Sequence, residues 1–267
     1  MSRRTARQAA SLLAALSLAA PAVFAAEDEA IATDRPDFVE SSNVVGLGRL
    51  QVETSALLER GRSEGVRSRV LSTPTLVRIG AGESFELRVE SDGRAVAHER
   101  DALGQRSTGA AWNDAALGVK WHVADGGGSM PSVGVLLHAD LNSGSASARG
   151  QGVRPSLRVV GEWQLADGYA LGVMPGIGAE RNEDSKSYRY GILGVVLGKE
   201  LTEKLRGFAE IAMPKIARAR DGGTEATFDL GAAWLLSDTV QVDAMLARGL
   251  NRRTPDLALT VGLSFKY

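Results

Sequence analysis

The sequence predicts an all-β fold: a closed antiparallel transmembrane β-barrel of about 12 strands, with short periplasmic turns and longer extracellular loops. Beyond residue 45, apolar and polar side chains alternate with a period of two residues, as in strands whose two faces meet different surroundings. Short and long connections alternate along the same region, as they do in bacterial outer-membrane barrels. No apolar run of roughly 18 residues follows the N-terminal region, so spanning helices are not expected there.

The first 25 residues have the three parts of a secretory signal peptide. Arg3, Arg4 and Arg7 precede the apolar run 9–18, and small residues close the segment at Ala25. An uncleaved membrane anchor is the alternative, but Ser11, Ser17 and Pro21 interrupt the apolar stretch. We therefore expect cleavage after Ala25 and export to the outer membrane.

Residues 26–45 form a separate segment before the first strand. It contains the charged and proline-bearing stretch Thr33, Asp34, Arg35, Pro36 and Asp37, a composition that is unfavourable for a membrane strand. The segment is expected either to be a solvated periplasmic lead-in or to enter the barrel mouth as a plug.

Residues 46–267 are predicted to form the barrel. The last strand shows the pattern most clearly, since Leu257, Leu259, Val261, Leu263 and Phe265 share one face, opposite Thr260 and Ser264. The predicted strands cover residues 46–58, 67–79, 85–91, 113–123, 131–141, 154–165, 169–178, 188–200, 205–212, 225–236, 240–250 and 257–267.

The connections between these strands fall into two classes. Short turns are predicted at 80–83, 125–128, 166–168, 202–204 and 237–239. Longer polar connections are predicted at 59–66, 91–112, 142–153, 179–187, 213–224 and 251–256. Because long and short connections alternate throughout, all the short turns lie at one end, and both ends of the barrel chain lie in the periplasm.

Aromatic residues mark the two ends of the predicted strands. Tyr and Trp prefer membrane–water interfaces, and an inner girdle is predicted beside the short turns and the C-terminus from Phe85, Trp121, Trp163, Tyr169, Trp234, Phe265 and Tyr267. A thinner outer girdle is predicted from Trp112, Tyr188 and Tyr190. A soluble β-sandwich or small ligand-binding barrel also has alternating strands, but with the apolar face inside. Strand number, loop alternation and girdle placement favour the membrane barrel.

If the apolar faces meet lipid, the opposite faces line the lumen. The candidate lumen residues, some of which would contact solute, are Glu53, Arg78, Glu86, Arg88, Lys120, His122, His138, Asp140, Arg158, Glu162, Glu210, Asp229 and Asp243, together with Gln51, Arg206, Thr227 and Gln241. Their charges are mixed, whereas strong ion selectivity calls for a ring of one sign, so most are expected to pair and brace the barrel. The inward face of strand 188–200 stays open, because Arg189 and Lys199 share a face with Leu193, Val195 and Leu197.

The sequence offers little sign of an enzyme. His138 and Asp140 point the same way, but an outer-membrane phospholipase site would place a serine nucleophile where Asp140 stands. There is no cysteine, no recognised catalytic or phosphate-binding motif and no metal-spaced carboxylate cluster. With 31 Lys and Arg against 32 Asp and Glu and no basic run, nucleic-acid binding is not expected. We expect no catalytic residues, no metal and no cofactor.

The opening of the mature chain resembles a known family. Thr33 to Phe38, then Glu40-Ser41 and the Gly48 to Glu53 strand start, are similar to the start of outer-membrane transporter-like proteins of the putative MetA-pathway of phenol degradation family. The end resembles it too, at 249–251, 255–256 and 262–265, whereas 141–145 departs from the family's Pro-Thr-Gly.

The resemblance implies a barrel for passive uptake of small organic solutes, aromatic or hydrophobic ones included. The expected partners are outer-membrane lipid, a small organic solute and the barrel-assembly machinery, with the chain a monomer. The alternatives are a sealed structural or surface-interaction barrel and, third, an outer-membrane lipid hydrolase.

Overall fold

The computed structural model describes residues 30–63, 65–182 and 184–267. The predicted signal peptide, residues 1–25, lies outside these described residues. Within them the chain forms one antiparallel sheet that closes on itself, because β15 pairs with both β14 and β1. The strands are β1 Leu50–Ser63, β2 Val66–Ser72, β3 Thr75–Gly80, β4 Phe85–Ser91, β5 Arg94–Arg100, β6 Arg106–Trp112, β7 Ala115–Ala124, β8 Ser132–Asp140, β9 Arg154–Gln164, β10 Tyr169–Arg181, β11 Ser187–Thr202, β12 Leu205–Ile216, β13 Glu225–Ser237, β14 Val240–Gly249 and β15 Leu257–Lys266.

Fifteen strand segments make a barrel of twelve strands, because three strands are each interrupted once. The interruption between β2 and β3 falls at Pro74, which has no N–H to give to the ladder. That between β4 and β5 falls at Gly93, whose φ is 65°, and that between β6 and β7 falls at 113–114. The predicted closed twelve-strand antiparallel barrel is therefore confirmed.

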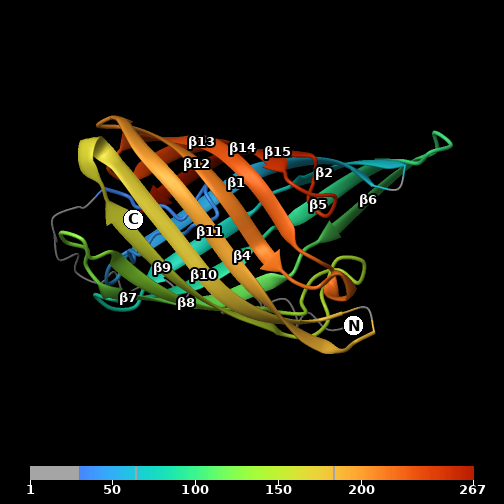
Figure 1. Cartoon of the computed structure of the whole chain (residues 1–267), viewed down its shortest axis with the longest axis horizontal. Helices are drawn as coiled ribbons and strands as arrows, with labels where there is room; N and C mark the ends of the chain where they lie inside the picture. Colours follow the sequence, from blue (N-terminus) through green and yellow to red (C-terminus); the bar gives the residue numbers. More distant parts are fainter. Residues whose placement is uncertain (1–29, 64, 183) are drawn as a thin grey trace, which may run out of the picture.

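The prediction of long polar connections at 59–66 and 91–112 was wrong. β1 continues to Ser63, and β5 and β6 occupy most of 91–112, so β1, β2, β5 and β6 pair in that order beyond the barrel wall. Figure 1 shows this extension projecting at the end opposite the C-terminus. Backbone pairing does not require apolar side chains, so charged strands outside the membrane carry little of the alternation on which the prediction depended.

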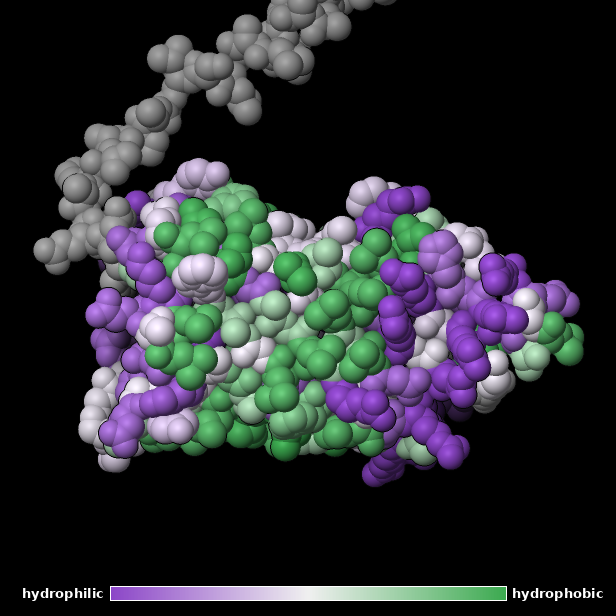
Figure 2. All heavy atoms as spheres, turned by 90° about the horizontal axis from the view of Figure 1, so that it is seen from above, coloured by the Kyte–Doolittle hydropathy of each residue, from purple (hydrophilic) through white to green (hydrophobic). Residues whose placement is uncertain are grey.

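The apolar face of the strands points outward. In β15, Val261 is 56% exposed while Ser264 on the opposite face is fully buried. Figure 2 shows the apolar residues gathered across the middle of the barrel surface, with hydrophilic residues on both sides of them. This arrangement is the reverse of a soluble sandwich or ligand-binding barrel, where the apolar face is inside. No helix in the described ranges is long and apolar enough to cross a membrane.

The aromatic residues near the short turns lie on the outer surface as predicted. Phe85 and Trp121 stack with ring centroids 5.8 Å apart, and Phe265 and Tyr267 meet edge to face at 5.6 Å. Tyr188 and Tyr190 are different, because they share a face with the buried Ile192 and point into the lumen. Their assignment to an outer girdle was wrong. The same alternation along the strand shows which way β11 faces, because Leu193, Val195 and Leu197 point outward.

Residues 30–45, which we call the inner segment, lie inside the barrel. The segment begins at the short-turn end, where the N–H of Ile31 bonds to the carbonyl of Asp238 at 2.7 Å. It returns to the same end, where the N–H of Gly48 bonds to Gly80 at 3.1 Å before β1 begins. Figure 1 shows it in blue within the half of the barrel nearer the C-terminus. The inner segment therefore enters and leaves the lumen from one side.

Candidate functional site

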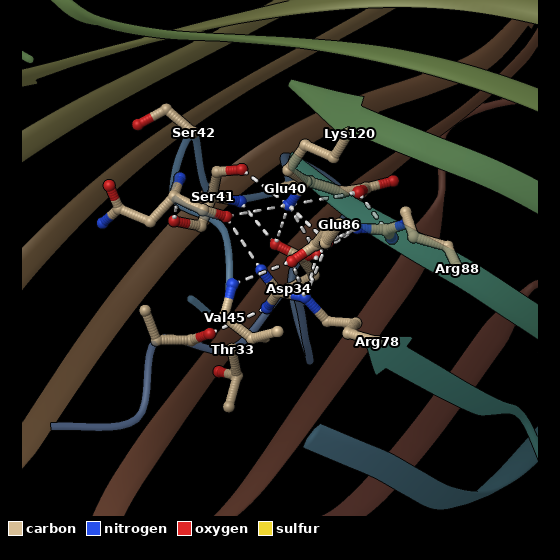
Figure 3. A network of polar contacts seen from close by, with 12 residues as sticks. Thr33, Asp34, Glu40, Ser41, Ser42, Val45, Arg78, Glu86, Arg88 and Lys120 are labelled. Carbon is tan, nitrogen blue, oxygen red and sulfur yellow. Dashed lines mark hydrogen bonds and ion pairs between the residues drawn. The ribbon is translucent and has the colours of Figure 1, made fainter. Parts of the chain in front are cut away.

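The centre of the lumen holds a carboxylate surrounded by three cations. Asp34 of the inner segment lies against Arg78 on β3, Arg88 on β4 and Lys120 on β7, which we call the basic triad (Figure 3). Lys120 Nζ is 2.7 Å from both carboxylate oxygens of Asp34, Arg88 Nη1 is 2.5 Å from Oδ2, and Arg78 Nε is 3.4 Å from Oδ2. The side chains of Asp34, Arg78 and Lys120 are at most 1% exposed.

Strand register explains why the triad forms. Arg78 on β3 is directly opposite Arg88 on β4, and Lys120 on β7 is opposite Glu86 on β4. Residues two apart on a strand share a face, so Glu86 and Arg88 both point inward. Three neighbouring strands thus bring the cations to one depth, although Arg78 and Lys120 are 42 residues apart in the chain.

Two wall carboxylates partly neutralise the triad. Arg78 lies 3.1 Å from Glu53 and 2.9 Å from Glu86, and Arg88 lies 3.0 Å from Glu86. Glu53 also accepts the N–H of Asp34 at 3.0 Å, and Glu86 accepts the N–H of Val45 at 3.0 Å. The wall therefore binds the backbone of the inner segment as well as its side chains.

The charge state of Asp34 follows from these neighbours. Burial by itself opposes ionisation of its carboxyl, but the positive charges of Arg78, Lys120 and Arg88 hold the pKa of Asp34 well below its ordinary value. Asp34 is accordingly ionised across the physiological pH range, and the contact is an ion cluster rather than a set of neutral hydrogen bonds.

Further polar contacts hold the rest of the inner segment. Glu40 bridges Arg88 at 2.7 Å and Arg158 at 2.9 Å, so it links the triad to β9. Glu210 on β12 accepts the N–H groups of Phe38 at 2.8 Å and Val39 at 2.7 Å. Because these donors belong to consecutive residues, a single carboxylate fixes the backbone between them.

The C-terminal part of the inner segment, at Ser42, is held by residues of β7, β8 and β9. Ser42 donates from its N–H to Glu162 at 2.6 Å, and its hydroxyl lies 2.7 Å from that of Ser132. A ring nitrogen of His122 lies 3.0 Å from the carbonyl of Ser42. The inner segment is thus bonded to opposite walls of the barrel.

One wall of the lumen is apolar rather than polar. Phe38 and Val39 pack against side chains that we call the apolar patch: Leu136, Val160, Met174, Val196 and Phe208 on β8 to β12. Each member of the patch is at most 6% exposed. Arg158 lies between this patch and the triad, with its guanidinium carbon 6.0 Å from the centre of the Phe38 ring. The lumen therefore offers a cationic surface beside an apolar one.

The structure divides the sequence-predicted lumen residues into two groups. Those whose side chains contact the inner segment are Glu53, Arg78, Glu86, Arg88, Lys120, His122, Arg158, Glu162 and Glu210, with Gln51, Arg206 and Gln241. His138, Asp140, Asp229 and Asp243 make no hydrogen bond or ion pair to it among the described residues. Thr227 bonds to Asp229 at 3.0 Å on the same strand.

The residues of the predicted plug motif have distinct contacts. Thr33 accepts a bond from Gln241 at 2.7 Å, Asp37 pairs with Arg206 at 3.2 Å, and Arg35 reaches Ser55 at 3.5 Å. Pro36 follows a cis peptide bond. Besides the contact of Asp34 with the triad, the motif thus reaches β14, β12 and β1.

Several residues with clear roles in the structure were given no role in the sequence analysis. Glu40 and Ser42 carry polar contacts of the inner segment, and the apolar patch lies at inward positions that were expected to be polar. Asp114 accepts the N–H groups of Ser143, Gly144 and Gly150 at 3.0, 2.7 and 2.8 Å. Its position beside Asn113, where a strand was predicted to begin after a long connection, was the available signal, because such residues often bind nearby backbone.

His138 and Asp140 lie nearer the long-loop end of the lumen. His138 is 2.8 Å from Glu90 through Nδ1 and 3.3 Å from Asp140 through Nε2. Both ring nitrogens therefore face carboxylates, which is the geometry of a bracing cluster.

Two cavities open beside the inner segment near the short turns. One, of about 570 Å³, is lined in part by Asp37, Val39, Val196 and Arg206. The other, of about 250 Å³, is lined in part by Ser42 and Glu162. Within the described residues no group of three or more His, Cys, Asp or Glu side chains could hold a metal ion.

The barrel is similar to solved outer-membrane structures of very different sequence. The COG4313 outer membrane channel from Pseudomonas putida F1 is 10% identical with a TM-score of 0.58, covering 87% of this chain and 99% of that one. The translocator domain of the autotransporter NalP from Neisseria meningitidis is 14% identical with a TM-score of 0.50, covering 84% and 90%. The KdgM porin is 11% identical with a TM-score of 0.50, covering 81% and 99%.

Identities this low show a shared fold and nothing finer. No curated protein matches the chain. A family model, however, matches residues 33–267, from near the start of the inner segment through β15. The chain therefore belongs to the family described as Putative MetA-pathway of phenol degradation.

Proposed function

We propose that this protein is an outer-membrane channel for passive uptake of small organic solutes, aromatic and other hydrophobic ones included, and that the inner segment constricts its lumen. The observation that carries this is a closed barrel, apolar outside, whose charged lumen is crossed by a segment bound only through non-covalent contacts. Water or solute can replace such contacts, so the lumen can open without unfolding of the barrel. A barrel whose lumen is filled by side chains of its own strands would have to unfold to open.

Twelve strands suit this role. Eight-stranded barrels have interiors that side chains fill, and porins of 16 to 18 strands leave an open aqueous channel. A twelve-stranded lumen lies between these and holds the inner segment, which folds back to the end at which it enters. The COG4313 protein and the KdgM porin, named as a channel and a porin, share the fold. We propose that the working chain is a monomer inserted by the barrel-assembly machinery.

The test is the single-channel current of the full-length mature protein in planar bilayers, compared with Glu210→Gln. An amide offers one oxygen to the two N–H groups of Phe38 and Val39, so the inner segment is held less firmly. Expected are discrete openings in the parent protein and longer open times in the variant. Glu83→Gln, at the exposed turn between β3 and β4, is the matched control and should behave like the parent.

A sealed structural or surface-interaction barrel is the second candidate, favoured by the hairpin of β5 and β6 that extends beyond the wall. Absence of current from the parent and Glu210→Gln, with both proteins shown to be folded, would support it over the channel. A lipid hydrolase gains no support from His138, because its ring nitrogens are both engaged by carboxylates. Lipase activity lost in His138→Ala would contradict this assignment.

A further inference from the structure

The inner segment presents a carboxylate to the basic triad and, four residues later, a phenyl ring to the apolar patch. We propose that the triad and the patch together form a binding site for a small organic acid, a carboxylate carried on an apolar or aromatic body. In the structure, Asp34 and Phe38–Val39 occupy that site. The proposal rests on the channel function, because a solute reaches the site only through the lumen.

The geometry around Asp34 is that of carboxylate recognition. One carboxylate receives the Lys120 ammonium on both oxygens at 2.7 Å and the Arg88 guanidinium on Oδ2 at 2.5 Å. Short charge-assisted bonds of this kind are among the strongest in proteins. All three cations project from the barrel wall, so they remain in place when the inner segment moves.

Charge balance specifies a single negative charge for the ligand. The three cations of the triad and Arg158 face three carboxylates besides Asp34, namely Glu53, Glu86 and Glu40, which leaves one positive charge uncompensated. Asp34 supplies the missing negative charge in this structure. A buried unpaired charge is strongly unfavourable, so departure of Asp34 favours entry of another monoanion.

The apolar patch specifies the rest of the ligand. Phe38 and Val39 cover Leu136, Val160, Met174, Val196 and Phe208, and Glu40 with Arg158 joins this patch to the triad. The guanidinium of Arg158 near the Phe38 ring is an arrangement that also suits an aromatic solute. A compact aromatic carboxylate would satisfy both surfaces, whereas an inorganic anion would satisfy only the triad.

The cavity of about 570 Å³ connects this region to the short-turn mouth. Val39 and Val196 line it, so the cavity adjoins the apolar patch. Its volume falls within the range of about 300–1,000 Å³ that is usual for small-molecule sites. A solute therefore has space beside the inner segment before that segment is displaced.

The first test is rescue of Asp34→Ala by an exogenous carboxylate. The thermal unfolding midpoint of the full-length detergent-solubilised variant is measured in sodium benzoate, sodium chloride and benzyl alcohol with sodium chloride, at one ionic strength. Benzoate is expected to raise the midpoint of Asp34→Ala by several degrees over chloride, and benzyl alcohol is not. Asp184→Ala, whose side chain is 73% exposed in an outer loop, is the matched control and should show no benzoate effect.

A double variant shows where benzoate binds. In Asp34→Ala with Lys120→Gln the wall cluster is already neutral, so benzoate should no longer raise the midpoint. Equal effects of benzoate and chloride on Asp34→Ala, or an equal benzoate effect in the double variant, would overturn the proposal. Because this readout involves no current, a sealed barrel would not obscure it.

Channel current supplies the second test. Openings of Asp34→Ala should be blocked by benzoate in a concentration-dependent way and not by benzyl alcohol, with the block weakened at least tenfold when Lys120→Gln is added. Current without a benzoate-specific block would overturn the organic-acid site and leave the channel intact. Absence of current in every variant, with benzoate rescue of unfolding retained, would instead contradict the channel and keep the site.

Discussion

A disulfide between the inner segment and the wall would show whether this segment has to move for the channel to open. The chain has no cysteine, so Val39→Cys with Gly172→Cys creates a single defined pair. A Cβ added at Gly172 on β10 would lie 4.0 Å from the Cβ of Val39, within the range of about 3.5–4.5 Å that disulfides adopt. The same Cβ would come within 2.8 Å of a methyl group of Val196, so the single variants are required as controls.

The bond would close a loop of about 130 residues, for which chain entropy gives a stabilisation of about 5 kcal/mol as an upper value. More importantly, it removes release of Val39 from β10 as an accessible motion. If openings require that release, the oxidised double variant carries no more than background current. Its reduced form should recover the current of the single variants.

The assay is single-channel recording of the oxidised protein before and after reductant is added to the same bilayer. Val39→Cys and Gly172→Cys alone should be insensitive to reductant. Gel mobility under non-reducing conditions verifies that the bond has formed. Equal open times in the oxidised and reduced double variant would refute the reasoning, because the inner segment would then be a fixed lining of the pore.

Two further predictions concern the outer loop and the lipid face. Hydrogen bonds from Gly150, Gly144, Arg154 and Ser143 outweigh burial and lower the pKa of Asp114 to about 2 from the ordinary 3.8. Docking of loop 142–153 is therefore fully stabilised above about pH 4 and lost as pH falls toward 2. In Asp114→Asn the loop should be loose at every pH, as measured by amide exchange at Gly144; equal protection in parent and variant at neutral pH would contradict this. On the lipid face, Leu230→Arg near mid-strand should lower the free energy of unfolding in vesicles by about 2–4 kcal/mol, and Leu236→Arg near the short turn by about 0–1 kcal/mol. Reversible denaturant unfolding measures both values. Similar losses at both sites would place the membrane elsewhere.

The strands that cross the membrane could be predicted because lipid imposes a strict rule on them. Outward residues there are predominantly apolar, and Leu257, Leu259, Val261 and Leu263 display the two-residue period without interruption. The same parity placed Arg78, Arg88 and Lys120 inside, where the structure has them. The alternation along a strand does not show which inward residues contact one another, since those contacts depend on the register between strands and on the inner segment.

The features that were missed lie where the rule does not apply. Strands β5 and β6 extend beyond the wall, and their charged residues satisfy no apolar pattern. The residues of the apolar patch point inward, where polar side chains were expected. They can be apolar because Val39 and Phe38, rather than water, cover them. Tyr188 was assigned by its position near a strand end, but its inward parity puts its hydroxyl 2.5 Å from Glu180.

The ion pairs between Asp34 and the triad make release of the inner segment energetically costly, which the alternation along the strands does not show. Lys120 has no exposed surface, and its ammonium nitrogen has Asp34 as its nearest carboxylate, since Glu86 and Glu40 lie at 3.9 and 3.8 Å. Removing one partner of a buried pair leaves a charge whose solvation has already been lost. The inner segment cannot leave the lumen at low energetic cost unless water or another anion reaches Lys120 at the same time. If the barrel is the proposed channel, its opening and the binding of a carboxylate should therefore be coupled, and each should promote the other by the same factor.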